Sequence, residues 1–348
     1  MILWVYIEAA INRLRIMTPA HATLLLTRKD VSELLPLSDC IQAVEQAFQL
    51  QGEGRAPAPG VLGVHAQGGG FHIKAGTLPL GRNYFAAKTN ANFPGNPARG
   101  LPTIQGVILL FDADNGQVLA AMDSMEITTL RTGAATAVAA KFLARKDSRT
   151  ATICGCGNQG RVQLRAIGHA CPLENAFAWD IQNDAAERFA LAMAAELGIA
   201  VTPVSDLPAA LRQSDICVTC TPAKKFFIHE KDVPPGMFIA AVGADNEDKQ
   251  ELDPALLGPK NKVVADVLAQ CATIGDLHHA LAAGTATVSG VYAELGEIVC
   301  GKKLGRTSAE EITIFDSTGM ALQDVASAAI VYEKAVKEGK GMRLDFGC

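Results

Sequence analysis

Three glycines spaced as Gly155-x-Gly157-x-x-Gly160 lie within the stretch TATICGCGNQGRVQLRAI, residues 150–167. An apolar, β-branched segment precedes them and an amphipathic one follows, which predicts a strand, a tight turn and a helix. Gly155 would permit the turn, Gly157 would let the backbone approach a pyrophosphate, and Gly160 would let the helix pack closely on the strand. The start of a helix also favours phosphates. The spacing therefore predicts a dinucleotide-binding loop; the alternative is a loop of the same fold that binds no dinucleotide.

An acidic residue, Asp180, ends the next predicted strand, NAFAWD, and follows Gly160 at the spacing of about 20 residues that accompanies this motif. Its carboxylate can accept hydrogen bonds from both hydroxyls of an adenine ribose. Ile181 and Gln182 come next and supply no cation for a 2′-phosphate. The sequence therefore favours NAD over NADP. The other loop and strand-end positions expected to contact this cofactor are Asn158, Gln159 and Thr221.

A second acidic residue, Asp245, follows the predicted strand in MFIAAVGADNEDKQEL. Ligands of open parallel sheets collect at the carboxyl ends of the strands, so we expect Asp245 in that crevice. A carboxylate there could move a proton to or from an amine while a hydride moves. An aspartate that merely caps a helix or shapes a loop is an equal alternative.

Upstream of the glycine motif, three cationic residues on or near predicted strands are candidates for the site: Lys74 in FHIKAGTL, Lys88 in FAAKTN, and Arg131 at the predicted start of an alanine-rich helix. An arginine at a helix start opposes the macrodipole, so we expect Arg131 to bind an anion such as a substrate carboxylate. For each lysine alone, a solvated position on a strand is the usual alternative.

The elements that must position these residues change in character near residue 130. Beyond it, strand and helix patterns alternate, which predicts an α/β doubly wound parallel sheet. Before it, residues 23–125 predict an antiparallel α+β module. That module begins with a strand at 23–27 and a helical pattern over 30–54, and the stretch 52–70, rich in glycine and proline, is expected to be a loop.

Two further patterns complete the predicted architecture. Asn115-Gly116 between apolar runs is a strong hairpin signal, because both residues tolerate positive φ angles. After Asp316 the chain ends in a long helical pattern over 320–338, and a terminal helix of this kind often returns to the first module. The predicted organisation is an extension at 1–22, a first domain from 23–129 with 317–348, and an inserted nucleotide-binding domain at 130–316.

Composition restricts the partners and the compartment. The 348-residue chain is 49% hydrophobic with a formal net charge of -5, and it has no basic block, so a nucleic-acid partner is not expected. It has no apolar run of about 18 residues, so no membrane span is expected. The nine cysteines form no clear zinc-site pattern, so we expect no metal and a reducing, cytoplasmic location. Residues 1–22 read poorly as a signal peptide; a helical extension or an upstream start codon are the alternatives.

Together these segments resemble the ornithine cyclodeaminase/mu-crystallin family over roughly residues 23–334. The motifs that carry the resemblance are AAKTNANFPGNPARGLPTIQGVILLFDADNGQ, EITTLRTGAATAVAAKFLA, ICGCGNQG, VGADNEDKQEL and ITIFDSTGMALQD. The resemblance implies a homodimer. It also implies a substrate-binding and dimerisation domain made from both chain ends, with a Rossmann domain inserted between them.

The resemblance also implies roles for particular residues. By similarity, Lys88 and Arg131 bind the substrate carboxylate, and Asp245 is the catalytic acid/base. Lys74 lies on a strand that some members use for another carboxylate contact. The Ser-x-Gly pair that would lie beside the nicotinamide is Ser317 and Gly319.

Two departures from the family pattern weaken the case for ornithine as the substrate. Ornithine cyclodeaminases carry a further arginine upstream, but residues 61–73 contain none and Arg55 lies in the glycine- and proline-rich stretch. Many members also read x-P-G-K-x-E-L after the catalytic aspartate, whereas residues 246–252 here read NEDKQEL.

The expected reaction is hydride transfer between NAD and Cα of a small α-amino or α-imino acid. Three outcomes stay open: cyclodeamination, such as L-ornithine to L-proline plus ammonia, reduction of a ketimine such as Δ1-pyrroline-2-carboxylate, or an alanine-type dehydrogenation. An alternative of another class is a mu-crystallin-like binding protein with little or no turnover. The joint presence of Lys88, Arg131 and Asp245 argues against that class.

Overall fold

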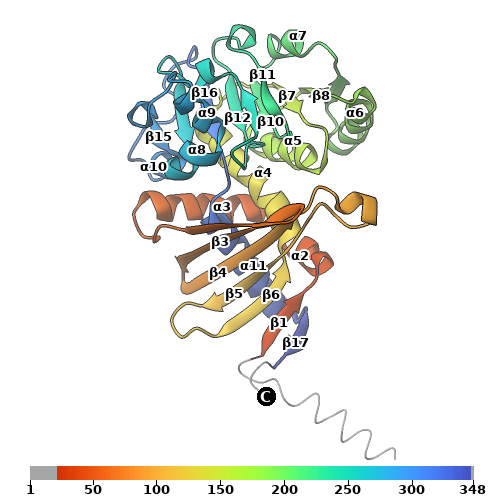
Figure 1. The fold of residues 1–348 in the computed structure, drawn as a ribbon, viewed down its shortest axis with the longest axis vertical. Coiled ribbons are helices and arrows are strands. Elements are labelled where there is room, and N and C mark those ends of the chain that lie inside the picture. The colour runs from red at the N-terminus through yellow and green to blue at the C-terminus, as the bar shows by residue number, and fades with distance from the viewer. Residues whose placement is uncertain (1–21, 346–348) are drawn as a thin grey trace, which may run out of the picture.

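The computed structural model describes residues 22–345, which form two large sheets joined by long helices (Figure 1) and one small two-stranded sheet. The first sheet has seven strands in the order β17-β1-β6-β5-β4-β3-β2. Neighbours are antiparallel except for the parallel pair β1 and β6. The strands are β1 (Thr23–Leu26), β2 (Gly60–Ala66), β3 (Gly69–Leu80), β4 (Arg82–Asn92), β5 (Ile104–Asp112), β6 (Val118–Asp123) and β17 (Met342–Leu344).

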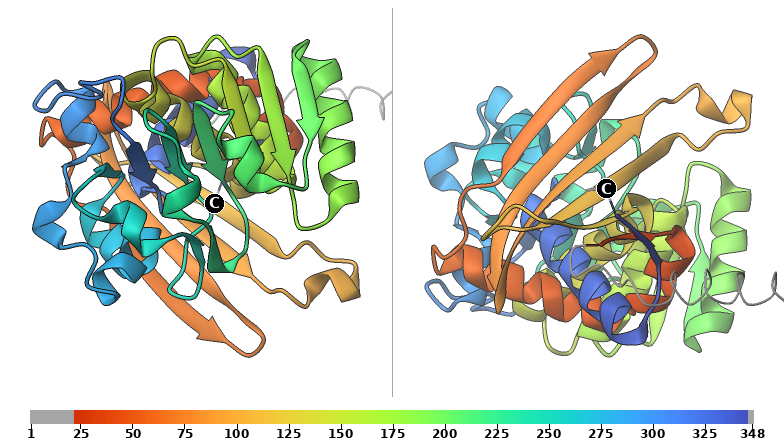
Figure 2. Two further views of the ribbon diagram at one scale, coloured as in Figure 1. Left: turned by 90° about the horizontal axis from the view of Figure 1, so that it is seen from above. Right: turned by 90° about the horizontal axis from the view of Figure 1, so that it is seen from below.

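One prediction about this sheet is wrong: part of the expected loop at 52–70 is the strand β2. Every residue of β2 is exposed, so the strand buries no apolar face that could reveal it in the sequence. Pairing with β3 from Gly60 to Ala66 holds it at the sheet edge. The β2–β3 hairpin extends beyond the rest of the molecule in both views of Figure 2.

The expected single helical stretch over 30–54 is two helices, α2 (Arg28–Leu34) and α3 (Leu37–Gly52). Pro36 explains the break, because proline disfavours helical geometry at the residue before it. Leu35 accordingly has φ -118° and ψ 77°, outside the helical region. The Thr27 side chain caps α2 by accepting the N–H of Asp30.

The helix α4 (Ser124–Leu143) runs from the first sheet toward the second. Its first turn is capped by Asp123, whose carboxylate accepts the N–H groups of Met125 and Glu126 at 3.0 Å each. The prediction that Arg131 starts this helix is therefore wrong. Arg131 lies about two turns inside it, where the end charge of the helix no longer acts, so another cause must explain its position.

The second sheet has eight strands, all parallel, in the order β15-β14-β16-β12-β10-β7-β8-β9. The strand order reverses between β7 and β10, which makes the crevice there the expected ligand position of a doubly wound fold. Its strands are β7 (Thr150–Cys154), β8 (Asn175–Trp179), β9 (Ala200–Pro203), β10 (Ile216–Thr219), β12 (Phe238–Ala241), β14 (Lys262–Ala265), β15 (Ala293–Glu294) and β16 (Thr313–Asp316).

Helices and a small two-stranded sheet of β11 and β13 complete the second part. The described helices include none that is long and apolar enough to cross a membrane. The elements are α5 (Asn158–Ala170), α6 (Asn183–Leu197), α7 (Leu207–Leu211), β11 (Lys224–Ile228), β13 (Gln250–Leu252), α8 (Leu268–Ile274), α9 (Asp276–Ala282) and α10 (Leu295–Val299).

The last long helix, α11 (Ala321–Glu338), packs on α3 and on β3 and β4 of the first sheet. β17 then pairs with β1. One apolar core cluster continues through both sheets, from Phe48 and Ile108 to Phe315. A Rossmann sheet is thus inserted into an α+β unit built from both chain ends, while the domain boundaries given above stay a prediction.

Candidate active site

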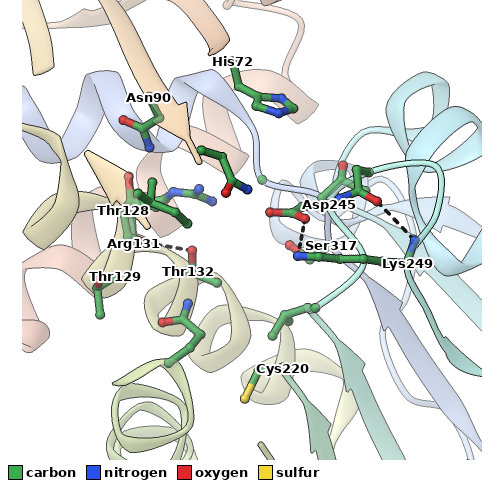
Figure 3. Close-up of a pocket in the computed structure, with 18 of the residues that line it drawn as sticks. His72, Asn90, Thr128, Thr129, Arg131, Thr132, Cys220, Asp245, Lys249 and Ser317 are labelled. Atoms are coloured by element: carbon green, nitrogen blue, oxygen red, sulfur yellow. Dashed lines mark hydrogen bonds and ion pairs between the residues drawn. The ribbon is translucent and has the colours of Figure 1, made fainter. Parts of the chain in front are cut away.

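A cavity of about 430 Å³ lies between the two sheets. β3, β4 and α4 contribute its lining on one side, and the loops after β7, β10, β12 and β16 contribute the other (Figure 3). It therefore coincides with the carboxyl ends of the parallel strands. Every residue predicted for the site lines it except Gly155, Gly157, Gly160 and Asp180, which lie in and beside the adjoining glycine loop.

Lys74, Lys88 and Arg131, here called the cation cluster, are buried against one another. Lys74 on β3 pairs directly opposite Lys88 on β4. Neither lysine is a solvated strand residue, because Lys74 is 9% exposed and Lys88 is 3% exposed. Nζ of Lys74 donates to the carbonyls of Thr318 at 2.9 Å and Gly319 at 2.6 Å.

Asp324, which the sequence analysis missed, holds the other two cations together. Its Oδ2 lies 2.7 Å from Nζ of Lys88, and its Oδ1 lies 3.3 Å from Nε of Arg131. Gln323 adds a side-chain acceptor 3.0 Å from Nη1 of Arg131. Buried charges require partners, so this ion pair, and not the helix dipole, explains the position of Arg131. The available signal was an acidic residue within the apolar start of a helix, MALQDVASAAIV.

Burial makes the charged forms of the lysines in this cluster less favourable than they are in water. Burial lowers the pKa of Lys88 to about 7, although Asp324 acts in the opposite direction. Burial and the charge of Arg131 also lower the pKa of Lys74. Burial would raise the pKa of Asp324, but Lys88 and Arg131 outweigh it and keep that pKa below its usual value. An entering carboxylate would restore the preference of both lysines for their charged form.

Asp245 follows β12 and faces the same cavity (Figure 3). Its Oδ1 lies 2.6 Å from Nζ of Lys249. The side chain of Asp245 is 53% exposed and that of Lys249 is 20% exposed. Asp245 can therefore contact a ligand, while Lys249 lies in the cavity wall and pairs with it. The role of Lys249 as the partner of Asp245 was not predicted from the sequence.

The three glycines have the backbone geometry that their spacing predicts. Gly155 has φ +103°, and a Cβ there would lie 3.0 Å from the carbonyl oxygen of Cys220. A Cβ on Gly160 would lie 2.1 Å from the carbonyl oxygen of Gly155, so the helix and strand could not approach as they do. A Cβ on Gly157 would meet nothing within 4 Å, which leaves that backbone open to a ligand.

The helix α5 begins beside this open backbone with Gly157 at its N-cap and no side-chain hydrogen bond to the cap. Its first N–H groups are thus without the side-chain acceptor that commonly satisfies them. Asp180 is held next to the loop, since its carboxylate accepts the N–H of Cys156 at 2.9 Å and of Gln182 at 3.0 Å. Asn158 and Gln159 line the cavity.

Asp266, a second missed residue, fixes the turn after β16. Its Oδ2 accepts the Oγ–H of Ser317 at 3.0 Å and the N–H of Gly319 at 2.6 Å. Gly319 has φ +84°, and a Cβ there would lie 2.5 Å from Nη1 of Arg131. Glycine is therefore required both for the turn and for the approach of the arginine. Asp266 directly follows the strand KVVA, the same strand-end position that identified Asp180.

Glu251, also missed, joins the ends of two neighbouring strands. Its Oε1 accepts the N–H of Thr221 at 2.6 Å and the Oγ–H at 2.7 Å, and its Oε2 accepts the N–H of Gly243 at 2.9 Å. Burial raises the pKa of Glu251 even though these hydrogen bonds favour its charged form. The carboxylate thus positions the cavity edges after β10 and β12.

Comparison with known proteins identifies relatives over nearly the whole described chain. The chain is 39% identical to the alanine dehydrogenase of Archaeoglobus fulgidus over 326 residues, which are 93% of this chain and 98% of the relative. It is 33% identical to the iminosuccinate reductase of Paracoccus denitrificans over 330 residues, covering 92% and 99%.

Solved structures agree with these relatives. The Thermococcus litoralis Δ1-pyrroline-2-carboxylate reductase in complex with NADH and L-proline matches with a TM-score of 0.87 and 35% identity, covering 92% of this chain and 100% of that one. An archaeal alanine dehydrogenase dimer with bound NAD matches with a TM-score of 0.89 and 38% identity, covering 93% and 99%. The profile of the ornithine cyclodeaminase/mu-crystallin family matches residues 21–339. This chain belongs to that family.

Proposed function

We propose that the protein is an NAD-dependent oxidoreductase that acts on the bond between Cα and nitrogen of a small α-amino or α-imino acid. One observation carries the proposal: the cation cluster and Asp245 face a single cavity that continues to the open glycine loop. A carboxylate clamp, an acid/base group and a dinucleotide loop are the three parts this chemistry requires.

The residues of the loop fit NAD. The open backbone at Gly157 and the uncapped start of α5 suit a pyrophosphate. Asp180, followed by the exposed Ile181, suits a ribose without a 2′-phosphate. Relatives solved with NAD or NADH support the same assignment. The further positions proposed to contact the cofactor are Gly155, Asn158, Gln159, Gly160, Thr221, Ser317 and Gly319.

In the proposed mechanism, NAD supplies the hydride acceptor when bound, and NADH supplies the donor for the reverse direction. The cation cluster binds the substrate carboxylate. Arg131 and Lys88 contact it on one side and remain paired with Asp324 on the other. Cα is thereby held toward the turn at Ser317 and Gly319, which is proposed to border the nicotinamide. Asp245 holds the proton that leaves or reaches the substrate nitrogen, and Nζ of Lys249 lies 2.6 Å from its Oδ1.

Among the three reactions left open by the sequence, the cavity favours imine reduction or amino-acid dehydrogenation over cyclodeamination. A diamine substrate needs an acceptor for its distal ammonium. Of the described residues that line the cavity, Asp245 is the sole carboxylate, and Lys249 already neutralises it. Among the described lining residues, a distal ammonium would therefore find no free carboxylate, and only neutral hydroxyl and amide oxygens could accept from it.

We also propose a homodimer, as in the relative solved as a dimer. One face of the first sheet carries exposed apolar side chains on β2, β3 and β5, with β4 between β3 and β5: Leu62, Val64, Phe71, Val107 and Leu109. An exposed apolar patch of this kind is typical of an association surface. Sedimentation equilibrium should give twice the chain mass; a monomer would contradict this part of the proposal.

The activity is tested by NADH absorbance with Δ1-pyrroline-2-carboxylate, with pyruvate plus ammonia, and with NAD⁺ and L-alanine. We expect NADH to be consumed in the first two assays or formed in the third. Proline formed from ornithine without net NADH would instead identify a cyclodeaminase. Cofactor binding without turnover on any of these substrates would overturn the proposal and favour a binding protein.

A further inference from the structure

The turn after β16 is held from two sides. Asp266, which follows β14, binds its donor groups: Oδ2 accepts from Ser317 and Gly319. Oδ1 accepts the Oγ–H of Thr318 at 3.2 Å. Lys74, which lines the cavity, donates from Nζ to the carbonyls of Thr318 and Gly319. The position of the Lys74 ammonium is thus tied, through the turn, to that of the Asp266 carboxylate.

Both oxygens of Asp266 face backbone N–H groups. Oδ2 accepts that of Gly319 at 2.6 Å, and Oδ1 accepts that of Val267 at 2.7 Å. A carboxylate is an acceptor on both sides, whereas an amide has one acceptor and one donor group. An asparagine here would therefore point its NH₂ at a backbone N–H in either orientation. The turn requires a carboxylate, and not only a side chain of that shape.

The same turn contacts a second member of the cation cluster. A Cβ at Gly319 would lie 2.5 Å from Nη1 of Arg131. Gln270 holds the carbonyl side, because its Nε2 donates to Oγ1 of Thr318 at 2.7 Å and to the carbonyl of Gly319 at 3.0 Å. A displacement of the turn would therefore disturb two of the three cations proposed to bind the substrate carboxylate.

The charge of Asp266 also acts on Lys74. The Lys74 ammonium donates to neutral carbonyls, so its charge depends on carboxylates further away. Burial lowers the pKa of Lys74, and Asp266 is among the carboxylates that act in the opposite direction. Removal of this carboxylate would thus loosen the turn and also make the charged form of Lys74 less favourable.

We infer that Asp266 is a positioning residue for the substrate carboxylate, which it orients by fixing the turn at residues 317–319 and thereby the ammonium of Lys74. This inference rests on the proposed function, in which Lys74 binds that carboxylate. Asp266 is fully buried and does not line the cavity. Its influence on the substrate must therefore pass through the turn and Lys74.

A double-mutant cycle with Lys74 tests this coupling. The probe is Δ1-pyrroline-2-carboxylate with saturating NADH or L-alanine with saturating NAD⁺, whichever the wild type turns over. The pH is kept below the pKa of Lys88, about 7. We expect Lys74→Met to raise the KM of the acid about tenfold to a hundredfold, and Asp266→Asn to raise it about tenfold. In the Lys74→Met background, Asp266→Asn should add less than about threefold, because the group that it positions is absent.

The outcomes separate the inference from the proposed function. The same rise in KM for Asp266→Asn in both backgrounds would mean that Asp266 acts independently of Lys74. That result would overturn the inference and leave the proposed function intact. A wild type that turns over neither probe would instead overturn the proposed function.

Two further variants control for loss of structure. Asp112→Asn is the matched control, since Asp112 is also buried and accepts a backbone N–H, that of Asp114 at 2.8 Å, but does not line the cavity. It should leave KM unchanged. Gln270→Met loosens the turn from its carbonyl side and should raise KM about threefold, again only while Lys74 is present. This second cycle decides the question if NADH fluorescence shows that Asp266→Asn is not folded. An unchanged KM in Gln270→Met and in folded Asp266→Asn would contradict the assignment.

Discussion

The glycine loop between β7 and α5 is contiguous in sequence, whereas the cation cluster takes side chains from β3, β4 and α4 and its counter-ion from α11. The loop requires residues without a side chain, because a Cβ at Gly160 would collide with the backbone of Gly155. The cluster depends on mutual neutralisation of buried charges. Damage to the loop should therefore be steric and local, and damage to the cluster should be electrostatic and dependent on pH.

Asp245 lies between the two regions, and its variant should have the largest effect. We expect Asp245→Asn to lower kcat/KM about 10²- to 10⁴-fold, because the amide cannot take or give the proton. NADH affinity, measured by fluorescence titration, should stay nearly unchanged. Turnover close to that of the wild type would refute the acid/base role.

Within the cation cluster, Asp324→Asn should destabilise the fold by about 3–5 kcal/mol, because Lys88 and Arg131 lose the charge that pairs with them in the interior. Urea unfolding measures this change. The control is Asp248→Asn, which removes an exposed partner of Lys224 and should leave stability almost unchanged. Equal changes in the free energy of unfolding of the two variants would mean that the buried ion pair contributes no more to stability than the exposed one.

In the glycine loop, Gly160→Ala should cost about 1–3 kcal/mol of stability through overpacking and weaken NADH binding. Gly168→Ala is the control on the same helix. Its added Cβ would meet nothing within 4 Å, so it should stabilise the protein by up to about 1 kcal/mol. If Gly160→Ala binds NADH as tightly as the wild type, close packing of α5 on β7 is not required for the cofactor.

The cluster should also respond to pH in a way that the loop does not. A bound carboxylate favours the ammonium form of Lys88, whose pKa is lowered to about 7 in the free protein. Affinity for the substrate should therefore be constant below that pH and fall above it, with KM rising by up to about tenfold per pH unit. Lys88→Arg should abolish this rise, since a guanidinium stays charged. A KM independent of pH in the wild type would exclude Lys88 as the titrating group.

The smallest effect is expected at the edge of the loop. Asp180→Ala should weaken NAD binding about tenfold, the effect of one lost charge-assisted hydrogen bond, and should weaken NADP binding less. Calorimetric titration with both dinucleotides measures the two affinities. Equal losses for the two cofactors would count against a contact between Asp180 and the ribose.

The sequence predicts the loop better than the cluster for a physical reason. Glycine spacing, a preceding strand and a following acid are local signals, and they located the loop. Arg131 was identified as an anion-binding candidate for a reason that the structure contradicts, since its true partner, Asp324, lies far away in the chain. Asp266 and Glu251 were missed in the same way, because their hydrogen bonds join separate strand ends.

The secondary structure follows the same rule. Alternating strands and helices with buried faces were predicted. The edge strand β2 was not, because backbone pairing alone holds it and no apolar pattern records that pairing. Pro36 shows the opposite error. The proline is a local signal for a helix break, but the prediction of one continuous helix did not take it into account.

The anchoring of Lys74 has a consequence for how ligands bind together. Its ammonium is held by the carbonyls of Thr318 and Gly319, and those residues belong to the turn proposed to border the nicotinamide. A dinucleotide that rigidifies this turn would also immobilise Lys74, one of the cations proposed to bind the substrate carboxylate. We therefore expect the two ligands to bind synergistically, each raising the affinity of the protein for the other.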